Sequence, residues 1–591
     1  MTCKTTSPAA RNLPGLGLAT TFLATALLQS FATSAPLEGG VTVRVSVSSD
    51  GAEGTQSSSL SQISADGDRV VFRSSAPNLV RGDTNGVSDA FVHTRSTGET
   101  IRVSVATDGT QGNGSVDEVA ISSDGNVVAF CSDATNLVPG DTNGVSDVFV
   151  HDLRTRETIR ASVASNGNQS NGSIGNGLIT LSHDGDRVAF TCDASNLAGS
   201  DNNDEPDVFL RKISAGKTIH ISVNNAGEGG DDTSQFAFLS DSGNYVSFQS
   251  ASSNFPHGSS GHSKIYVRDL ITRTTEVVSV DEGGGPANNL SYNSSISRDG
   301  RWVAFDSRAY NLVTPDTNNF RDIFLYDRRN STTIRITDSP EGPQANNESL
   351  NPVISDDARA IVFNSRASNL LQVDLNSSHD IIAFYRSSAS FELMTQSSAG
   401  APLNTSAKTA DLSAGGRYVS FWVDWPYLVY GDENGDADVY VRDIEPSWPM
   451  VYCPAEPSTN GCVSQIAFDG TPSASEGEGF TLSCTEIRNG TWGLLIYSTD
   501  GSDDRNMLGH TLCLTNTFRR TRVQPSGGSG TPGTNCSGTF ELDFNDLITE
   551  GSDSALVAGQ TVWAQYFMRD PVIPPSAGGS LSNAVVFTIG P

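Results

Sequence analysis

Short stretches of alternating apolar and polar residues recur along most of the chain, separated by glycine-bearing turns. In one repeat, Glu118–Ser122 alternates and leads into an Asp-Gly pair, and Asn126–Ser132 (NVVAFCS) is rich in β-branched and aromatic residues. Asp147–His151 (DVFVH) and Thr158–Val163 (TIRASV) follow as two further short apolar stretches. Short runs with regular turns predict β-strands, and an Asp-Gly pair favours a tight hairpin because glycine accepts positive φ. Each repeat therefore predicts four strands.

The turn that ends the first strand occurs seven times between residues 41 and 444. The last residues of successive turns lie 57 to 60 positions apart. The turns are Ser64–Gly67, Ser122–Gly125, Ser182–Gly185, Ser240–Gly243, Ser297–Gly300, Ser355–Ala358 and Ser413–Gly416. Four strands repeated radially at a constant period predict an all-β fold, a seven-bladed β-propeller.

The seventh repeat lacks its fourth strand, because the chain passes from Asp438–Arg442 directly into Glu445-Pro446. Val41–Val47 (VTVRVSV) matches the fourth strand Thr100–Val105 of the first repeat, but no other strand of its own repeat precedes it. We expect this N-terminal strand to pair into the last blade and close the ring, since an open ring would expose a sheet edge.

The repeat resembles that of a known propeller family. Ser-x-Asp-Gly-x-x-Val-Ala-Phe followed by Asp-Val-Phe-Val-x-Asp is similar to the WD40-like (PD40) repeat of TolB-type proteins, as in Ser182–Phe190 with Asp207–Leu210 and Ser297–Phe305 with Asp322–Asp327. The resemblance covers all seven repeats, which are longer than the family's between strands two and three. It implies a periplasmic or extracellular protein that binds partners, although the family is also found fused to peptidases.

The additional residues between strands two and three have a consensus, Asp-x-Asn-x-x-x-Asp. Six repeats keep it, and the fourth has Gly258–Lys264 in its place. Its members are Asp83, Asn85, Asp89, Asp141, Asn143, Asp147, Asp201, Asn203, Asp207, Asp316, Asn318, Asp322, Asp374, Asn376, Asp380, Asp432, Asn434 and Asp438. Carboxylate and amide oxygens are ligands that Ca²⁺ prefers, so these loops are candidate calcium sites. They are also candidates for structural turns, because Asn and Asp side chains bind nearby backbone amides.

The loop after strand two and the link to the next blade lie on the same face of a four-stranded blade. The links are long and polar, as in Asp108–Asp117 and Asn166–Asn176. Insertions gathered on one face of a repeat protein often form its binding face. We therefore expect an acidic, polar binding face, with a merely solvated face as the alternative.

The period stops at Glu445–Pro449, and five of the eight cysteines follow. Strand-like stretches separated by Pro- and Gly-rich runs predict a small β-sandwich over residues 446–591. The stretches are Phe480–Cys484, Gly493–Tyr497, Gly538–Asp543, Thr561–Phe567 and Asn583–Ile589. We expect the disulfides Cys453–Cys462 and Cys513–Cys536, although four cysteines allow three pairings. Cys131, Cys192 and Cys484 lie in apolar strands and are expected to be buried thiols.

The first 35 residues have the order of a secretory signal peptide. Lys4 and Arg11 precede the apolar stretch Leu13–Leu28, and small residues follow, with a cleavage site expected after Ala32. The predicted organisation is a signal peptide over 1–35, a propeller over 36–445 and a C-terminal domain over 446–591. An exported protein also has access to an oxidising compartment, which permits the disulfides. We expect a secreted or periplasmic location.

Composition and charge exclude several functions. The formal charge is −30, which argues against nucleic acid as a partner because phosphate binding needs a basic stripe. No later segment has the roughly 18 apolar residues of a membrane span. The chain has neither a Gly-x-Ser-x-Gly nor a His-Glu-x-x-His motif, so we expect no enzyme.

The predicted function is binding or scaffolding of a protein or glycan partner outside the cytoplasm, with calcium as a possible cofactor. One alternative is a purely structural cell-surface protein. Another is a carbohydrate-active lyase or hydrolase that uses the propeller channel, which a convergent carboxylate pair or a histidine cluster in the channel would favour.

Overall fold

The structure is a computed structural model that describes residues 40–589 apart from several short stretches. The stretches outside the description are 176–177, 200, 202, 259–260, 340–343, 372–377, 398–402, 404–405, 425–427, 430–431, 445–449, 453–461, 471, 474–479, 500–504, 508–509, 513, 515–517, 529–534, 550–552, 558–559 and 570–579. The predicted signal peptide lies outside the described residues.

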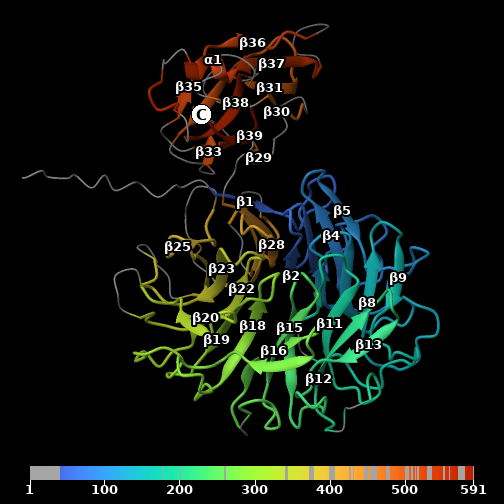
Figure 1. The fold of residues 1–591 in the computed structure, drawn as a ribbon. Coiled ribbons are helices and arrows are strands. Elements are labelled where there is room, and N and C mark those ends of the chain that lie inside the picture. Colours follow the sequence, from blue (N-terminus) through green and yellow to red (C-terminus); the bar gives the residue numbers. More distant parts are fainter. Residues whose placement is uncertain are drawn as a thin grey trace, which may run out of the picture. The chain divides into compact units, whose positions relative to one another are not determined.

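Seven four-stranded antiparallel sheets are present in the described part of residues 41–443. We call them the first to seventh blades in chain order (Figure 1). The strands of the first three blades are β2 (Ser58–Ile63), β3 (Arg69–Ser74), β4 (Asp89–Thr94), β5 (Glu99–Arg102), β6 (Val116–Ile121), β7 (Val127–Ser132), β8 (Asp147–Asp152), β9 (Glu157–Arg160), β10 (Thr180–Leu181), β11 (Arg187–Cys192), β12 (Asp207–Lys212) and β13 (Lys217–His220).

The remaining four blades repeat this arrangement. Their strands are β14 (Ser234–Leu239), β15 (Tyr245–Ser250), β16 (Lys264–Asp269), β17 (Thr274–Val277), β18 (Ser291–Ile296), β19 (Trp302–Ser307), β20 (Asp322–Asp327), β21 (Thr332–Arg335), β22 (Ser349–Ile354), β23 (Ala360–Ser365), β24 (Asp380–Tyr385), β25 (Ser390–Leu393), β26 (Ala407–Leu412), β27 (Tyr418–Val423), β28 (Asp438–Asp443) and the N-terminal β1 (Val41–Arg44).

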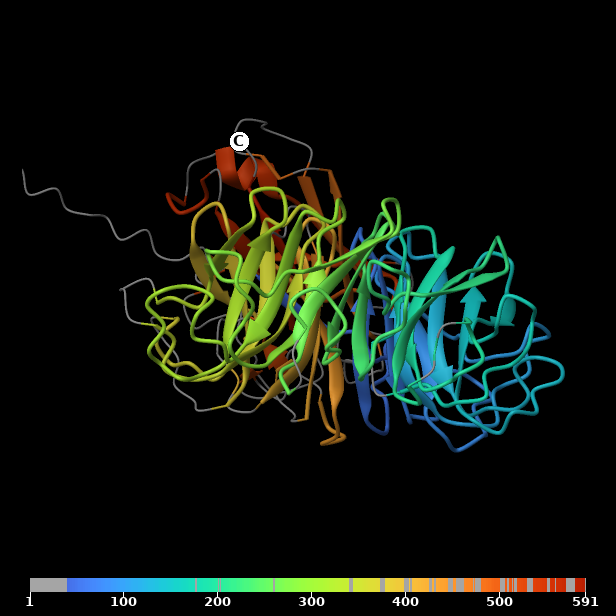
Figure 2. The ribbon, with the colours of Figure 1, turned by 60° about the horizontal axis from the view of Figure 1, so that its bottom comes forward.

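The core lies between neighbouring blades. The second strand of a blade is buried along its whole length in β7, because both faces of the sheet are covered. One apolar cluster joins Val71 and Val92 of the first blade to Val119 and Phe130 of the second. Adjacent blades contact one another in chain order, and the views in Figures 1 and 2 show the same sequence of sheets around the ring. The expected all-β propeller is confirmed.

The N-terminal strand closes the ring as predicted. β1 pairs antiparallel with β28, and Val41 lies opposite Asp443. Strand β2 of the first blade also contacts β26 and β27 of the seventh. The seventh blade is therefore assembled from both ends of the propeller, and the otherwise open edge of β28 is covered.

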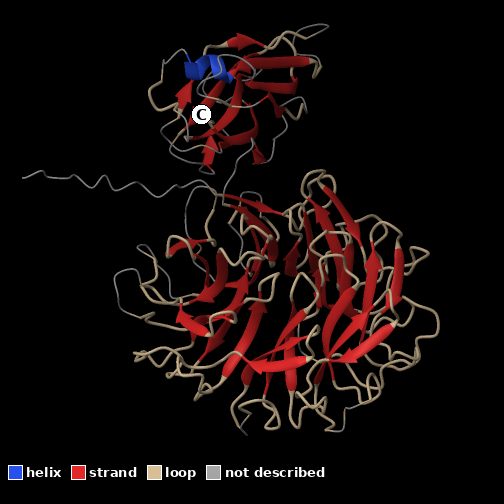
Figure 3. Cartoon of the chain, in the orientation of Figure 1, coloured by secondary structure: helices blue, strands red, loops and turns tan. Residues whose placement is uncertain are grey.

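The described C-terminal residues form two larger sheets, a hairpin and one short helix (Figure 3). The six-stranded sheet contains β29 (Met450–Tyr452), β32 (Trp492–Ser498), β35 (Arg519–Arg520), β36 (Gln524–Pro525), β38 (Thr561–Arg569) and β39 (Ser580–Thr588), and the three-stranded sheet contains β30 (Gln465–Gly470), β31 (Phe480–Ile487) and β37 (Gly538–Asp543). The hairpin is β33 (Arg505–Met507) with β34 (His510–Leu512), and the helix is α1 (Phe544–Thr549). Residues of both larger sheets share one core, including Leu482 and Tyr566, so the predicted sandwich is confirmed.

The predicted disulfides are wrong in their pairing. Cys462 is bonded to Cys536, whereas we expected Cys462 to pair with Cys453 and Cys536 with Cys513. Cys453 and Cys513 lie outside the described residues. The reason is the sheet order: β30 and β37 flank β31 and run parallel to each other, so the cysteines just before them meet at one end of the sheet.

The three remaining cysteines in the described residues, Cys131, Cys192 and Cys484, are buried free thiols, as expected. Among the described residues, we find no helix with the length and apolar character needed to cross a membrane.

Candidate functional site

The repeated aspartates are buried rather than displayed on a face. The last aspartate of the consensus is the first residue of the third strand in its blade, and Asp89, Asp147 and Asp322 have no exposed surface. The first aspartate is nearly as inaccessible, with side chains 5% exposed at Asp83 and 4% at Asp141. An acidic binding face made by these carboxylates is therefore not what the structure presents.

An arginine from the end of the fourth strand lies between the two aspartates in several blades. In the second blade, Arg160 Nη1 is 3.3 Å from Asp141 Oδ1 and 3.0 Å from Asp147 Oδ2. In the first blade, Arg102 Nη1 is 3.1 Å from Asp83 Oδ1 and 3.6 Å from Asp89 Oδ2. A positive charge is thus already present between these carboxylates.

The other blades vary this arrangement. In the fifth blade, Arg335 Nη1 is 3.4 Å from Asp316 Oδ2. In the third blade, the equivalent residue is His220, whose Nε2 is 3.2 Å from Asp207 Oδ1. The fourth blade has Lys264 in place of the last aspartate and Val277 in place of the arginine. Both charges of the pair are absent there, whereas the sixth blade keeps the buried Asp380 with Leu393 in place of the arginine.

The asparagine of the consensus joins the loop to the next link. Asn143 Nδ2 donates to Asp147 Oδ2 at 2.9 Å and to the carbonyl oxygen of Ser170 at 3.2 Å. Asn318 and Asn203 donate to the equivalent carbonyls of Ala345 and Gly230. In the first blade, Asn85 Oδ1 accepts from the Val87 amide, which is the Asx turn that the structural alternative requires.

The last aspartate also accepts a hydrogen bond from a hydroxyl in the link that follows the fourth strand. Ser162 Oγ donates to Asp147 Oδ1 at 2.5 Å, and Thr395 Oγ1 donates to Asp380 Oδ1 at 2.8 Å. Burial raises the pKa of Asp147 and raises that of Asp322 to about 6. Asp374 and Asn376 of the sixth blade lie outside the described residues.

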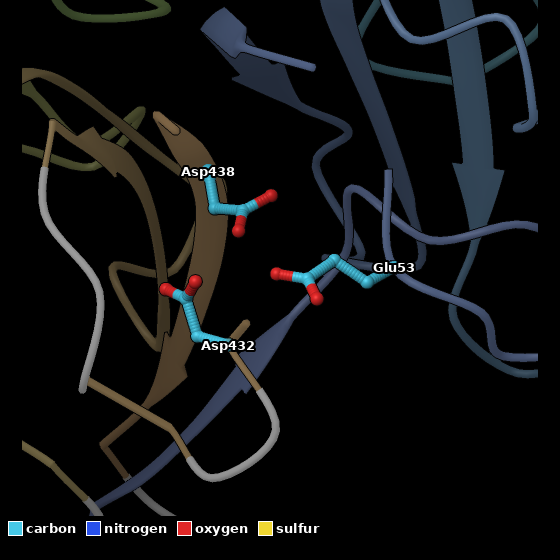
Figure 4. Close-up of side chains that lie close together, drawn as sticks. All are labelled: Glu53, Asp432 and Asp438. Atoms are coloured by element: carbon cyan, nitrogen blue, oxygen red, sulfur yellow. The ribbon is translucent and has the colours of Figure 1, made fainter. Parts of the chain in front are cut away.

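The seventh blade differs because a third carboxylate joins the pair. Glu53 lies on the link after β1, and single carboxylate oxygens of Glu53, Asp432 and Asp438 lie within 4.8 Å of one another (Figure 4). Arg44 Nη1 contacts Glu53 Oε1 at 2.6 Å and Asp438 Oδ2 at 3.3 Å. Burial raises the pKa of Asp432 and raises that of Asp438 to about 6. Asn434 Nδ2 donates to the Gly54 carbonyl, so this loop is tied to the N-terminal link.

A second charged group lies at the opposite end of the blades, where strand one turns into strand two. The turns of neighbouring blades are joined by backbone hydrogen bonds, for example from the Arg298 amide to the Asp356 carbonyl and from the Asp356 amide to the Ala414 carbonyl. They surround a cavity of about 80 Å³. Seven aliphatic residues, one per blade, line it: Ile63, Ile121, Leu181, Leu239, Ile296, Ile354 and Leu412. This cavity is the central channel at the turn end, and we call its opening the channel mouth.

The second residue of the turn is charged or titratable in four consecutive blades. Asp241 has a side chain only 4% exposed, with His183 Nδ1 at 3.3 Å and Arg298 Nε at 3.1 Å, yet neither of its oxygens accepts a hydrogen bond. Burial and the charge of Asp241 together raise the pKa of Asp356 to about 6. The mouth therefore has two carboxylates with one arginine and one histidine.

Asp411 adds a further acid to the channel wall. Its Oδ2 accepts from the Ile63 amide at 2.9 Å, and burial raises its pKa to about 6. Neither this residue nor the mouth residues were singled out from the sequence. The signal was present, because the second position of the turn is Ala or Ser in blades one, two and seven but His, Asp, Arg and Asp in blades three to six.

No family model matches the chain, and no curated protein matches it. Among solved structures, TolB of Acinetobacter baumannii matches with 13% identity and a TM-score of 0.32, over 57% of this chain and 62% of the TolB chain. The chain thus spans less than two thirds of that protein.

Two further structures are similar at a comparable level. The β-propeller domain of the trilobed protease of Pyrococcus furiosus, described as having an open velcro topology, matches with 12% identity and a TM-score of 0.42, over 66% of this chain and 94% of that domain. A putative TolB of Agrobacterium tumefaciens matches with 14% identity and a TM-score of 0.31, over 59% and 94% of the two chains. The propeller assignment itself rests on the sheet topology described above.

Proposed function

We propose that this chain is an exported, non-catalytic binding propeller that takes a cationic group of a protein partner at the channel mouth. The observation that carries the proposal is the convergence of Asp241 and Asp356 on the opening of a channel with an aliphatic wall. A long basic side chain has the matching chemistry, with an apolar stem for the aliphatic ring and a charged head for the carboxylates.

The size of the cavity favours a single side chain over a sugar. Pockets that enclose small-molecule ligands usually measure about 300–1,000 Å³, whereas this cavity measures about 80 Å³. The formal charge of −30, which becomes −32 when Lys4 and Arg11 leave with the signal peptide, also attracts basic partners at long range. Of the two partner classes expected from the sequence, a protein with a basic segment therefore fits better than a neutral glycan.

The buried carboxylate of Asp241 explains why a cationic side chain should bind at the channel mouth. Its two oxygens lack hydrogen-bond donors, and a buried carboxylate without donors is unfavourable. Arg298 already lies 3.1 Å from this carboxylate without donating a hydrogen bond, so what an incoming ammonium or guanidinium group adds is hydrogen-bond donors. Binding should therefore weaken as ionic strength rises, because the contact is electrostatic and lies at an open mouth.

Export is supported by the disulfide between Cys462 and Cys536, since disulfides persist in oxidising compartments. Fractionation of cells that express the full chain tests this part. We expect the protein in the periplasm or medium, with an N-terminus near residue 33. Cytoplasmic protein with an intact N-terminus and reduced cysteines contradicts it.

Binding is tested with residues 36–591 and fluorescently labelled peptides of equal length, one rich in lysine and one with glutamine in its place. We expect the lysine peptide alone to raise the fluorescence anisotropy. Asp241→Asn with Asp356→Asn should weaken it at least about tenfold, or 1.4 kcal/mol. Asp204→Asn with Glu205→Gln, which changes two exposed acids at the other end of the third blade, serves as the charge-matched control. Equal binding by the double variant and the control overturns the proposal.

A carbohydrate-active enzyme is the second candidate, because two carboxylates, the groups that most such enzymes use, line the same cavity. Asp241 and Asp356 differ in surroundings, and burial with a neighbouring charge raises the pKa of Asp356 to about 6. Incubation with neutral and acidic polysaccharides, followed by a reducing-end assay, tests it. Turnover that Asp356→Asn abolishes favours the enzyme, and its absence with peptide binding intact favours the binding propeller.

A further inference from the structure

We call the place where the N-terminal strand β1 and its link join the seventh blade the closing seam. Its loop carries more negative charge than the corresponding loops of the first and second blades. In the first and second blades, a glutamine of the link stands six residues after the valine that pairs with it, as in Val105 with Gln111 and Val163 with Gln169. In the seventh blade, Val47 pairs in the same way with Glu53. The glutamine is thus replaced by a carboxylate at this one seam among the described links.

The replacement changes both the charge and the hydrogen bonds. Gln169 Oε1 accepts from Arg160 Nη1 at 2.8 Å, and its Nε2 donates to the Gly140 carbonyl at 2.7 Å. Glu53 Oε1 likewise accepts from Arg44 Nη1, at 2.6 Å, but it has no group that can donate. Two aspartates and one arginine give the second blade a net charge of −1, and the additional glutamate gives the seventh −2.

One oxygen at this seam lacks a partner. Asp432 is 8% exposed, its Oδ2 accepts from the Tyr440 hydroxyl at 3.1 Å, and its Oδ1 is buried without a hydrogen bond. Figure 4 shows the Asp432 carboxylate beside that of Asp438 and facing that of Glu53. A buried carboxylate oxygen with no donor is unfavourable unless a cation or a proton is supplied.

We propose that Glu53, Asp432 and Asp438 bind one hard divalent cation, of the Ca²⁺ class, at the seam where the ring closes. The three residues offer only carboxylate oxygens, which suit Ca²⁺, Mg²⁺ or Mn²⁺ rather than a thiophilic metal. Ca²⁺ tolerates irregular sets of six to eight oxygens, so water completes its shell more readily than that of octahedral Mg²⁺. Arg44 keeps its place beside Glu53 and Asp438, so the net charge of −2 is left for the divalent cation to compensate.

The ion acts on closure because its ligands come from the two ends of the propeller. Glu53 follows the N-terminal strand β1, whereas Asp432 and Asp438 belong to the last blade. Binding to the folded ring stabilises it by mass action, about 2.7 kcal/mol at 100 times the dissociation constant. The bound ion thus links the N-terminal link to the last blade. Its site is separate from the channel mouth, which lies at the opposite end of the blades.

The test uses residues 36–591 freed of metal with EDTA and then dialysed, titrated with Ca²⁺ in a calorimeter. Tb³⁺ luminescence offers a second readout, since Tyr440 can sensitise an ion at Asp432. Glu53→Gln introduces the glutamine that the first, second and fifth blades have at this position, so we expect it to fold. It should lower Ca²⁺ affinity at this site at least about tenfold. Substitution of a residue that only contacts a metal ligand already costs about that much, and Glu53 is proposed as a ligand itself. Glu282→Gln, an exposed link residue, is the matched control.

The reciprocal variant is Gln111→Glu, which adds a third carboxylate beside Asp83, Asp89 and Arg102. We expect it to add about one Ca²⁺ per chain to the wild-type stoichiometry. Millimolar Ca²⁺ should raise the melting temperatures of wild type and of Glu282→Gln. It should raise the melting temperature of Glu53→Gln by a smaller amount. The proposal is overturned if wild type binds no Ca²⁺, or if Glu53→Gln binds as wild type does, in which case a proton shared by Glu53 and Asp432 accounts for the seam.

Discussion

Arg160 Nη1 lies 3.0 Å from Asp147 Oδ2 inside the second blade, where the carboxylate has no exposed surface. The aspartate opens the third strand and the arginine ends the fourth, so the pair fixes the corner where the loop enters the sheet. The contact recurs at Arg102 with Asp89. In these two blades each buried acid therefore has an internal partner, which a structural role for the repeated aspartates requires.

Arg160→Ala should therefore be strongly destabilising. It leaves Asp141 and Asp147 buried without their cation, and removal of one member of a buried ion pair usually costs about 3–5 kcal/mol. Denaturation in urea should show this loss at unchanged slope. Addition of Asp147→Asn should restore part of it, because the uncompensated charge is then gone.

The matched control is Arg154→Ala in the same blade. Arg154 pairs with Asp152 at 3.1 Å, but the two side chains are 58% and 26% exposed. Exposed ion pairs contribute little to the free energy of unfolding, so the urea midpoint of Arg154→Ala should stay close to that of wild type. Equal losses in the two variants would contradict the role of the buried pair.

Removal of the closing strand should destabilise the whole ring. A chain that starts at residue 48 lacks β1, which exposes the backbone of β28 from Tyr440 to Asp443 and removes Arg44. Exposed strand edges pair with other chains, so we expect a lower melting temperature and association in light scattering. A chain that starts at Gly40 keeps β1 and should behave as the mature protein. A stable monomer without β1 would show that closure is dispensable.

The sequence predicted the propeller and its closure because both depend on local patterns that repeat. The turn at Ser122–Gly125 and its equivalents fix the blade period, and the match between Val41–Val47 and Thr100–Val105 identifies a displaced strand. Burial in the loops was not predictable in this way. The same Asp-x-Asn spacing suits an ion or a turn, and the choice depends on Arg160, which comes 13 residues after Asp147 and meets it only across the sheet.

The disulfide pairing of the C-terminal domain could not be predicted either, because it also depends on which strands become neighbours in the folded sheet. Short spacing made Cys453 and Cys462 an attractive pair, but sheet order decides which cysteines meet. Cys462 and Cys536 precede the two strands that flank β31, so they lie at one end of that sheet with Cα atoms 5.5 Å apart. No local pattern in the sequence reports that β30 and β37 share a neighbour.

The Cys462–Cys536 bond should stabilise the C-terminal domain. It spans 74 residues, and loop closure of that length reduces the entropy of the unfolded chain by an amount worth about 4 kcal/mol. Replacement of both cysteines by serine should lower the transition of this domain by about 2–4 kcal/mol. Non-reducing peptide mapping should recover Cys462 linked to Cys536. Recovery of Cys462 linked to Cys453 would restore the pairing expected from the sequence.

Asp411→Asn should stabilise the propeller at neutral pH. Burial in the channel wall raises the pKa of Asp411 from 3.8 to about 6. Between these values the folded protein keeps a proton that the unfolded chain has lost, so the free energy of unfolding falls as pH rises, and the loss is complete above about pH 6. Asparagine can still accept from the Ile63 amide, as Gln62 and Thr180 accept from the equivalent amides of their neighbours.

Because Asp411 lines the channel and has contact with water there, we expect a gain of about 1 kcal/mol at pH 7 and none at pH 3.5, below the unfolded pKa. Urea denaturation at both pH values measures it. Asp66→Asn, which removes a carboxylate from the first-blade turn near the channel mouth, provides the charge-matched comparison. If Asp411→Asn changes stability equally at both pH values, its effect comes from hydrogen bonding rather than from the buried charge. The pKa of Asp411 is then raised less than its burial implies.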